Sequence, residues 1–117
     1  MILVIVSSLV VSETQFLVWL SLLVPPSVFV EKDLVVAKAG EAISLQCTAN
    51  GRPQPVIQWY KEQNLLQRTR KIAISSTGLL VINAADQNDT GFYTCLASNN
   101  VGSDSATVTV SVQSKFG

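Results

Sequence analysis

The sequence contains no histidine, and only 14% of its 117 residues are charged. Without histidine, a Ser/His/Asp or Cys/His catalytic arrangement is impossible, and a frequent zinc ligand is missing. The acidic residues form no run beyond Glu31 and Asp33, so a calcium site is not expected. Asp86 and Asp89 are the one carboxylate pair left as a catalytic candidate, and we interpret them as parts of a structural corner. The sequence therefore predicts a protein that is not an enzyme and that binds no metal or cofactor.

An excess of charge of one sign is also lacking, because 8 Lys and Arg residues balance 8 Asp and Glu residues. A nucleic-acid-binding domain would present a basic face, so no nucleic acid partner is expected. The only basic cluster contains Arg68, Arg70 and Lys71. We interpret this cluster as the solvated edge of a strand, with a heparin site as the alternative.

A hydrophobic segment opens the chain, with a single charged residue, Glu13, before Glu31. Its two apolar stretches, Ile2–Val11 and Phe16–Val24, are each shorter than the roughly 20 residues that a membrane-spanning helix needs. We therefore predict that residues 1–24 form a hydrophobic leader, with a secretory signal peptide as the first interpretation. No basic residue precedes the apolar stretches, so an uncleaved membrane anchor and a mis-started N-terminus remain alternatives.

The rest of the chain has the length and pattern of one all-β domain over residues 25–113, followed by a short tail or linker at 114–117. Short runs alternate apolar and polar residues, and turn residues separate them every 8–12 positions or so, as is typical of a β-sandwich. Asn50 and Gly51, close to two prolines, predict a loop. The predicted strands are Ser27–Val30, Leu34–Lys38, Ala42–Thr48, Val56–Lys61, Lys71–Ser75, Leu79–Asn83, Phe92–Ser98 and Ser105–Val112.

The core can be predicted from the alternation within these runs. Residues on one face of a strand differ by even numbers, and the best apolar residues of every run obey this rule. The predicted core residues outside the cysteines are Leu45, Trp59, Leu80, Ile82 and Tyr93.

The two cysteines, Cys47 and Cys95, suggest an oxidising compartment. An even number of cysteines in a short chain with an apolar leader favours a disulfide. Two buried free thiols in a cytosolic protein are the alternative.

Several motifs together resemble the intermediate (I-set) class of the immunoglobulin superfamily. Cys47, Trp59 and Cys95 match its Cys…Trp…Cys frame, and Asp89–Cys95 matches its D-x-G-x-Y-x-C corner. Three further segments resemble motifs of the same class: Gly51–Trp59, Gly78–Ile82 and Ala97–Gly102. The resemblance covers about residues 25–113.

This resemblance implies a two-sheet antiparallel Greek-key sandwich in which Cys47 and Cys95 link the sheets. Such a bridge closes a loop of roughly 50 residues and would contribute about 4 kcal/mol in the chain-entropy model. Trp59 would pack against the bridge, and Tyr93 would bond back to upstream backbone. Asp89 would form an ion pair with Arg70, with Lys71 as the alternative.

The family also implies a function. Similar domains occur in adhesion receptors, guidance receptors and matrix proteins of the hemicentin and peroxidasin kind. The resemblance thus implies a protein-interaction module of a secreted or membrane-attached protein, located outside the cell or at its surface. A structural spacer repeat from a large matrix or muscle protein, with no partner of its own, is the alternative.

Two candidate surface sites follow from the strand pattern. If Tyr93 and Cys95 point inward, the residues next to them along the strand point outward and form an exposed apolar group. An exposed apolar group with a polar rim is typical of interaction surfaces. The predicted face comprises Gln58, Tyr60, Phe92, Thr94 and Leu96, and its expected partner is another protein, including a second copy of this chain. Asn88 begins the sequon Asn-Asp-Thr and is a candidate glycosylation site.

Overall fold

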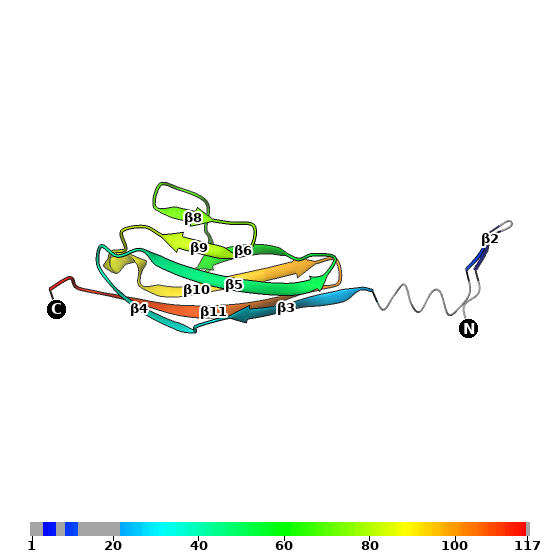
Figure 1. Cartoon of the computed structure of the whole chain (residues 1–117), viewed down its shortest axis with the longest axis horizontal. Helices are drawn as coiled ribbons and strands as arrows, with labels where there is room; N and C mark the ends of the chain where they lie inside the picture. The colour runs from blue at the N-terminus through cyan, green and yellow to red at the C-terminus, as the bar shows by residue number, and fades with distance from the viewer. Residues whose placement is uncertain (1–3, 7–8, 12–21, 117) are drawn as a thin grey trace.

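The computed structural model describes residues 4–6, 9–11 and 22–116. Within the described chain, two β-sheets pack face to face, and Figure 1 shows their strands running along the long direction of the domain. The elements of this sandwich are β3 (Val24–Val30), β4 (Leu34–Lys38), β5 (Ile43–Arg52), β6 (Val56–Lys61), β7 (Asn64–Leu65), β8 (Ile72–Ile74), β9 (Leu79–Ile82), the 3₁₀ turn η1 (Gln87–Asp89), β10 (Gly91–Asn99) and β11 (Gly102–Gln113).

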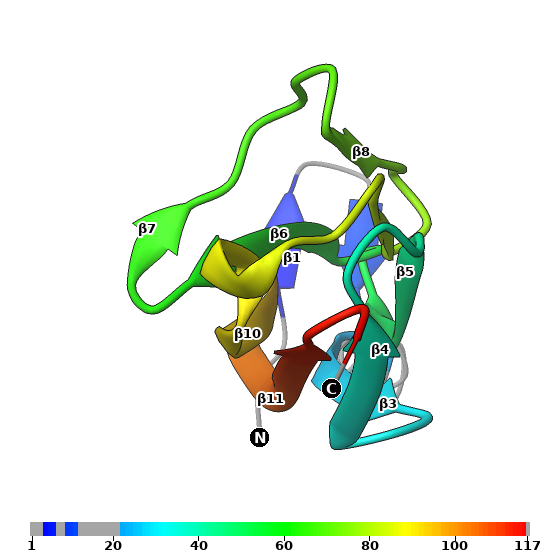
Figure 2. The same ribbon diagram turned by 90° about the vertical axis from the view of Figure 1, so that its left-hand side faces the viewer.

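The sheet order confirms the predicted immunoglobulin-like sandwich. One sheet has the order β4-β11-β10-β6-β7 and the other has the order β3-β5-β9-β8. The first two predicted runs, Ser27–Val30 and Leu34–Lys38, are the two halves of a split first strand, since β3 joins one sheet and β4 the other. One pairing differs from a purely antiparallel fold, because β4 runs parallel to β11. Figure 2 shows β7 and β8 at separate edges, joined by a segment that passes from one sheet to the other.

Strand β5 is longer than the sequence predicts. The pattern ends it at Thr48 and assigns Asn50 and Gly51 to a loop, whereas the structure continues the strand to Arg52. The reason lies in β3, which starts at Val24 and pairs with β5 as far as Arg52. Asn50 and Gly51 have a low propensity for strands, but pairing with β3 keeps this segment of β5 in the sheet.

The interior contains the predicted residues. Leu45, Trp59, Leu80, Ile82 and Tyr93 are each at most 2% exposed. They pack with other buried side chains into one core between the sheets. A disulfide joins the cysteines of β5 and β10 across this core, with their Cα atoms 6.4 Å apart.

Gly78 holds the chain close to this disulfide. Its φ of +98° is unfavourable for other residues, and a Cβ atom there would lie 2.0 Å from the carbonyl oxygen of Cys47. The carbonyl oxygen of Gly78 accepts hydrogen bonds from the backbone N–H of Cys47, at 3.0 Å, and from Nε1 of Trp59, at 3.2 Å. Glycine at this turn therefore provides the buried tryptophan with its polar partner.

The strands of the sandwich span 24–113, beginning one residue before the predicted boundary. Preceding them, β1 (Val4–Val6) and β2 (Leu9–Val11) form a short antiparallel pair. Most of the second apolar stretch of the predicted leader lies outside the described residues, so the leader stays a prediction. Among the residues that are described, no helix is long and apolar enough to span a membrane.

Candidate interaction face

The five predicted face residues come together on the outer side of the five-stranded sheet. Strands β6 and β10 are antiparallel neighbours, and their register places Tyr60 opposite Thr94 and Gln58 opposite Leu96. Phe92 continues the row on β10, because it lies two residues before Thr94 on the same side of the strand. Its N–H donates to Oε1 of Glu62 at 3.1 Å, and its carbonyl accepts from the Glu62 N–H at 3.0 Å. Two strands that are distant in sequence therefore present one continuous surface.

These side chains are accessible to different extents. Phe92 is 55% exposed and Gln58 is also exposed, while Tyr60, Thr94 and Leu96 are half-buried. The inward neighbours of Phe92 and Leu96 on β10 belong to the core, which fixes the direction of the outward set. Oγ1 of Thr94 lies 3.0 Å from Oγ1 of Thr107 on the adjacent strand, and this hydrogen bond links β10 to β11 on the same face.

The structure adds apolar residues that the sequence analysis did not include. Leu34 and Val36 of β4 are 55% and 54% exposed, and Leu65 of β7 is 45% exposed. Register relates two of them to the predicted face: Thr109 is the cross-strand partner of both Leu34 and Phe92, and Leu65 is the partner of Tyr60. Val36 lies two residues after Leu34, on the same side of β4. The signal in the sequence was the outward parity of Leu34 and Val36, but parity alone did not reveal which sheet their strand joins.

The extended surface, which we call the five-strand face, comprises Leu34, Val36, Gln58, Tyr60, Leu65, Phe92, Thr94 and Leu96 with the threonines between them. Lys38, at the end of β4, is the one charged residue among the outward positions of these five described strands. Tyr60 and Thr94 line a shallow hollow together with Glu62 and Gln63, which follow the end of β6. The face is therefore apolar to weakly polar at its centre, with charges at its edges.

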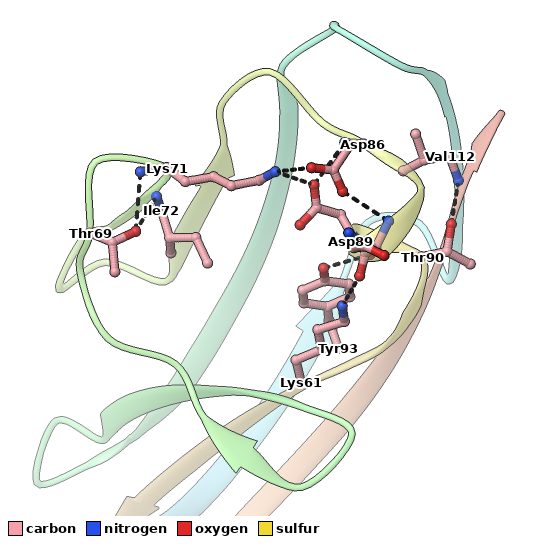
Figure 3. A network of polar contacts seen from close by, with 10 residues as sticks. Lys61, Thr69, Lys71, Ile72, Asp86, Asp89, Thr90, Tyr93 and Val112 are labelled. Carbon is pink, nitrogen blue, oxygen red and sulfur yellow. Dashed lines mark hydrogen bonds and ion pairs between the residues drawn. The ribbon is translucent and has the colours of Figure 1, made fainter. Parts of the chain in front are cut away.

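Asp86, Asp89, Lys71 and Tyr93 meet at the end of the domain that carries η1, and we call this group the polar corner (Figure 3). Oη of Tyr93 donates a hydrogen bond of 2.6 Å to the carbonyl oxygen of Asp89. Burial, reinforced by the nearby carboxylates of Asp89, Glu62 and Asp86, raises the pKa of the Tyr93 phenol above its ordinary value of 10. The hydrogen bond and the raised pKa together hold a neutral phenol in place at the corner.

The predicted ion pair between Asp89 and Arg70 is wrong, and the alternative partner, Lys71, forms it. Nζ of Lys71 lies 2.8 Å from Oδ2 of Asp89 and 2.9 Å from Oδ2 of Asp86. Lys71 is held by its backbone, because its carbonyl accepts from the Asn83 N–H at 2.8 Å. Arg70 and Lys71 both lie in a bend before β8, where Oγ1 of Thr69 accepts hydrogen bonds from the N–H groups of Lys71, at 3.1 Å, and Ile72, at 3.0 Å.

Charge pairing at the corner raises the pKa of Lys71 and lowers the pKa of Asp86. The carboxylates of Asp89 and Asp86 raise the pKa of the Lys71 ammonium group. Lys71, together with the Asn88 N–H, lowers the pKa of Asp86. Asp86 also caps η1, since its side chain accepts from the Asn88 N–H while Oδ2 of Asp89 accepts from the Asp86 N–H, at 2.8 Å each. Both carboxylates of the only acidic candidate pair are thus engaged in structural contacts.

No group of three or more His, Cys, Asp or Glu side chains suited to a metal ion occurs within the described part of the chain. Asn88, the candidate glycosylation site, is the middle residue of η1, and its side chain is exposed. It lies outside the strands of the five-strand face.

Comparison with known proteins identifies relatives of this fold. The family model for the immunoglobulin I-set domain matches residues 26–112. Hemicentin-2 of Mus musculus is 38% identical over 92 residues, covering 79% of this chain and 2% of hemicentin-2. Contactin-4 of Rattus norvegicus is 34% identical over 82 residues, covering 70% of this chain and 8% of contactin-4. A solved structure of tandem titin Ig domains is 36% identical with a TM-score of 0.71, covering 78% of this chain and 48% of that one.

Proposed function

Because the chain belongs to the immunoglobulin I-set family, we propose that it is a non-catalytic protein-interaction module that serves cell adhesion or recognition outside the cell. The observation that carries this proposal is the five-strand face. Aromatic and aliphatic side chains are contiguous there, with Phe92 exposed and Tyr60 half-buried, and Lys38 is the one charged residue among the outward strand positions. Depletion of charge at the centre, with aromatic residues present, is the composition that distinguishes binding surfaces from the rest of a protein.

An extracellular or cell-surface location is consistent with the family and with the disulfide. Hemicentin-2 and contactin-4 are the kind of protein in which such domains occur, although this chain spans only 2% and 8% of their lengths. The disulfide between Cys47 and Cys95 would persist in an oxidising compartment and would be reduced in the cytosol. The leader at 1–24 would then act as the signal that directs the chain to secretion or to the membrane.

The partner that we propose for the five-strand face is a second copy of the chain. When two identical surfaces meet about a two-fold axis, a charge close to the axis faces its own copy. On the five-strand face the outward strand positions other than Lys38 carry no charge, and a symmetric contact over them therefore brings few like charges together. The hollow beside Tyr60 would receive a side chain of the partner.

One observation favours a different function. The matched relatives are long proteins, of which this domain covers a small part, and the titin structure that it resembles is a tandem of such domains. A repeat in an array can serve as a spacer that holds other parts at a distance. A spacer needs no partner of its own and is expected to remain monomeric.

The double variant Tyr60→Ala, Phe92→Ser distinguishes these functions. We expect the secreted wild-type chain to increase in average mass with concentration in analytical ultracentrifugation, and the double variant to remain monomeric with an unchanged circular dichroism spectrum. Phe29→Ser is the matched control, because Phe29 is 66% exposed but lies on the opposite sheet, on β3. The control should associate like the wild type.

Two results would count against the proposal. A wild-type chain that stays monomeric at all concentrations, and that captures no partner from the surface of animal cells, favours the spacer. A double variant that associates as strongly as the wild type would instead remove the five-strand face from the interaction.

A further inference from the structure

The sequon Asn88-Asp89-Thr90 is built into the polar corner in a way that separates its three residues. Asn88 is exposed, and its backbone makes two hydrogen bonds: the N–H donates to Oδ1 of Asp86 at 2.8 Å, and the carbonyl accepts from Nζ of Lys61. Asn88 and Gln87 line a shallow surface hollow. A large group attached to this carboxamide would extend into solvent without displacing a core residue.

The other two residues of the sequon are held by the fold. Asp89 is only 9% exposed, and its Oδ2 receives both the Asp86 N–H and the Lys71 ammonium group. Oγ1 of Thr90 accepts a hydrogen bond of 2.9 Å from the Val112 N–H on β11. An enzyme that recognises the sequon must reach the Asn88 carboxamide and the Thr90 hydroxyl together, which requires this segment to leave the 3₁₀ turn.

The order of events along the chain follows from these contacts. Val112 is 22 residues beyond Thr90, so the Thr90 hydroxyl becomes engaged only after almost the whole domain has been synthesised. Until then the Thr90 hydroxyl lacks its partner on β11, and the pairing of β11 with β10 brings that partner into place. Folding and modification compete for the same residues.

From this geometry we propose that Asn88 carries an N-linked glycan that is attached before the corner closes, and that the folded domain then displays it beside η1. The reaction transfers an oligosaccharide from a lipid diphosphate donor: Nδ2 of Asn88 forms a bond to the anomeric carbon, and the bond from that carbon to the diphosphate oxygen breaks. The amide loses one proton, and the lipid diphosphate leaves. The inference depends on the proposed function only in that the chain must enter the secretory pathway.

The first test measures the modification in cells. The full chain is expressed in a secreting animal cell with a cleavable secretion signal fused before Met1, so that its own leader does not decide the result. We expect the intact mass of the secreted protein to fall by one N-glycan after treatment with peptide N-glycosidase. Asn88→Gln should abolish this difference, whereas Thr90→Ser, which keeps the hydroxyl of the sequon, should retain it. A secreted, disulfide-bonded chain of unmodified mass would overturn the site.

The second test measures the order. The unmodified chain is offered to purified oligosaccharyltransferase with a lipid-linked donor, once folded and oxidised and once reduced and unfolded, with Asn88→Gln as the blank. We expect the folded chain to remain unmodified during the time in which the unfolded chain is fully modified. Equal modification of the two forms would overturn the proposed order. A chain that is glycosylated with the fused signal, but is not secreted when its own N-terminus is free, would refute the proposed leader and leave the Asn88 site intact.

Discussion

Replacing Tyr93 by phenylalanine removes a single hydroxyl group from the interior and leaves the aromatic ring. Tyr93 is 1% exposed, and its hydroxyl donates the 2.6 Å hydrogen bond to the carbonyl oxygen of Asp89. The ring of Phe fills nearly the same space, so the cost of a cavity is small. The main effect is therefore a buried carbonyl that loses its partner, at the corner where η1 joins β10.

The magnitude follows from the burial of that bond. An acceptor left unsatisfied in the interior costs about 1–3 kcal/mol, and we expect roughly 2 kcal/mol for Tyr93→Phe. The loss is a substantial part of the roughly 5–15 kcal/mol by which a domain of this kind is stable. For a domain of about this size, the midpoint of thermal unfolding would fall by roughly 8–16 °C.

The assay is urea unfolding of the oxidised chain at neutral pH, followed by far-ultraviolet circular dichroism. Tyr60→Phe is the matched control, since it deletes the same hydroxyl from a half-buried ring on the five-strand face. We expect the control to change the free energy of unfolding by less than about 0.5 kcal/mol. Equal destabilisation by the two substitutions would refute the reasoning, because it would show that the cost does not come from the buried corner bond.

The corner supports two further predictions. Lys71→Ala should lower the midpoint of thermal unfolding more than Arg70→Ala does, because Lys71, and not Arg70, forms ion pairs with Asp86 and Asp89. Equal midpoints in differential scanning calorimetry would contradict the assigned ion pairs. The second prediction concerns pH. The pKa of Tyr93 is raised in the folded state, so the folded chain keeps a proton that the unfolded chain releases above about pH 10. The free energy of unfolding should therefore fall as the pH rises beyond that value. In the Tyr60→Phe variant, where Tyr93 is the remaining tyrosine, tyrosinate absorbance should appear only together with unfolding, and absorbance that rises while the circular dichroism is still native would disprove it.

Local alternation predicts which side of a strand is buried, and it does so without knowledge of the neighbouring strands. Trp59 and Tyr93 illustrate this, because each is flanked by more exposed residues and each lies in the core. The same rule predicted the outward set on β6 and β10. These two strands also pair directly, so the five predicted face residues are neighbours in the structure.

What alternation does not contain is the identity of the partner strand. Leu34 and Val36 point outward by parity, yet they join the five-strand face only because β4 pairs with β11, which lies at the other end of the sequence. Asn50 has the composition of a loop, but β3 pairs with it and extends the strand. The choice between Arg70 and Lys71 likewise depended on a contact of Lys71 with Asn83, 12 residues away in the chain.

The same alternation makes binding separable from folding in this domain. Tyr93 and Cys95 stabilise the sandwich from the inner side of β10, while Phe92, Thr94 and Leu96 occupy the outer side of that strand. A substitution on the outer side removes contact area from a partner and leaves core packing unchanged. It should therefore change the free energy of unfolding by no more than about 0.5 kcal/mol, as surface substitutions usually do. A substitution one position away on the inner side removes a core contact and is expected to reduce stability whether or not a partner is present. Phe92→Ser and Tyr93→Phe, at adjacent positions, should therefore have opposite effects: the first should weaken association in a fully stable domain, and the second should weaken the domain while the five-strand face remains intact.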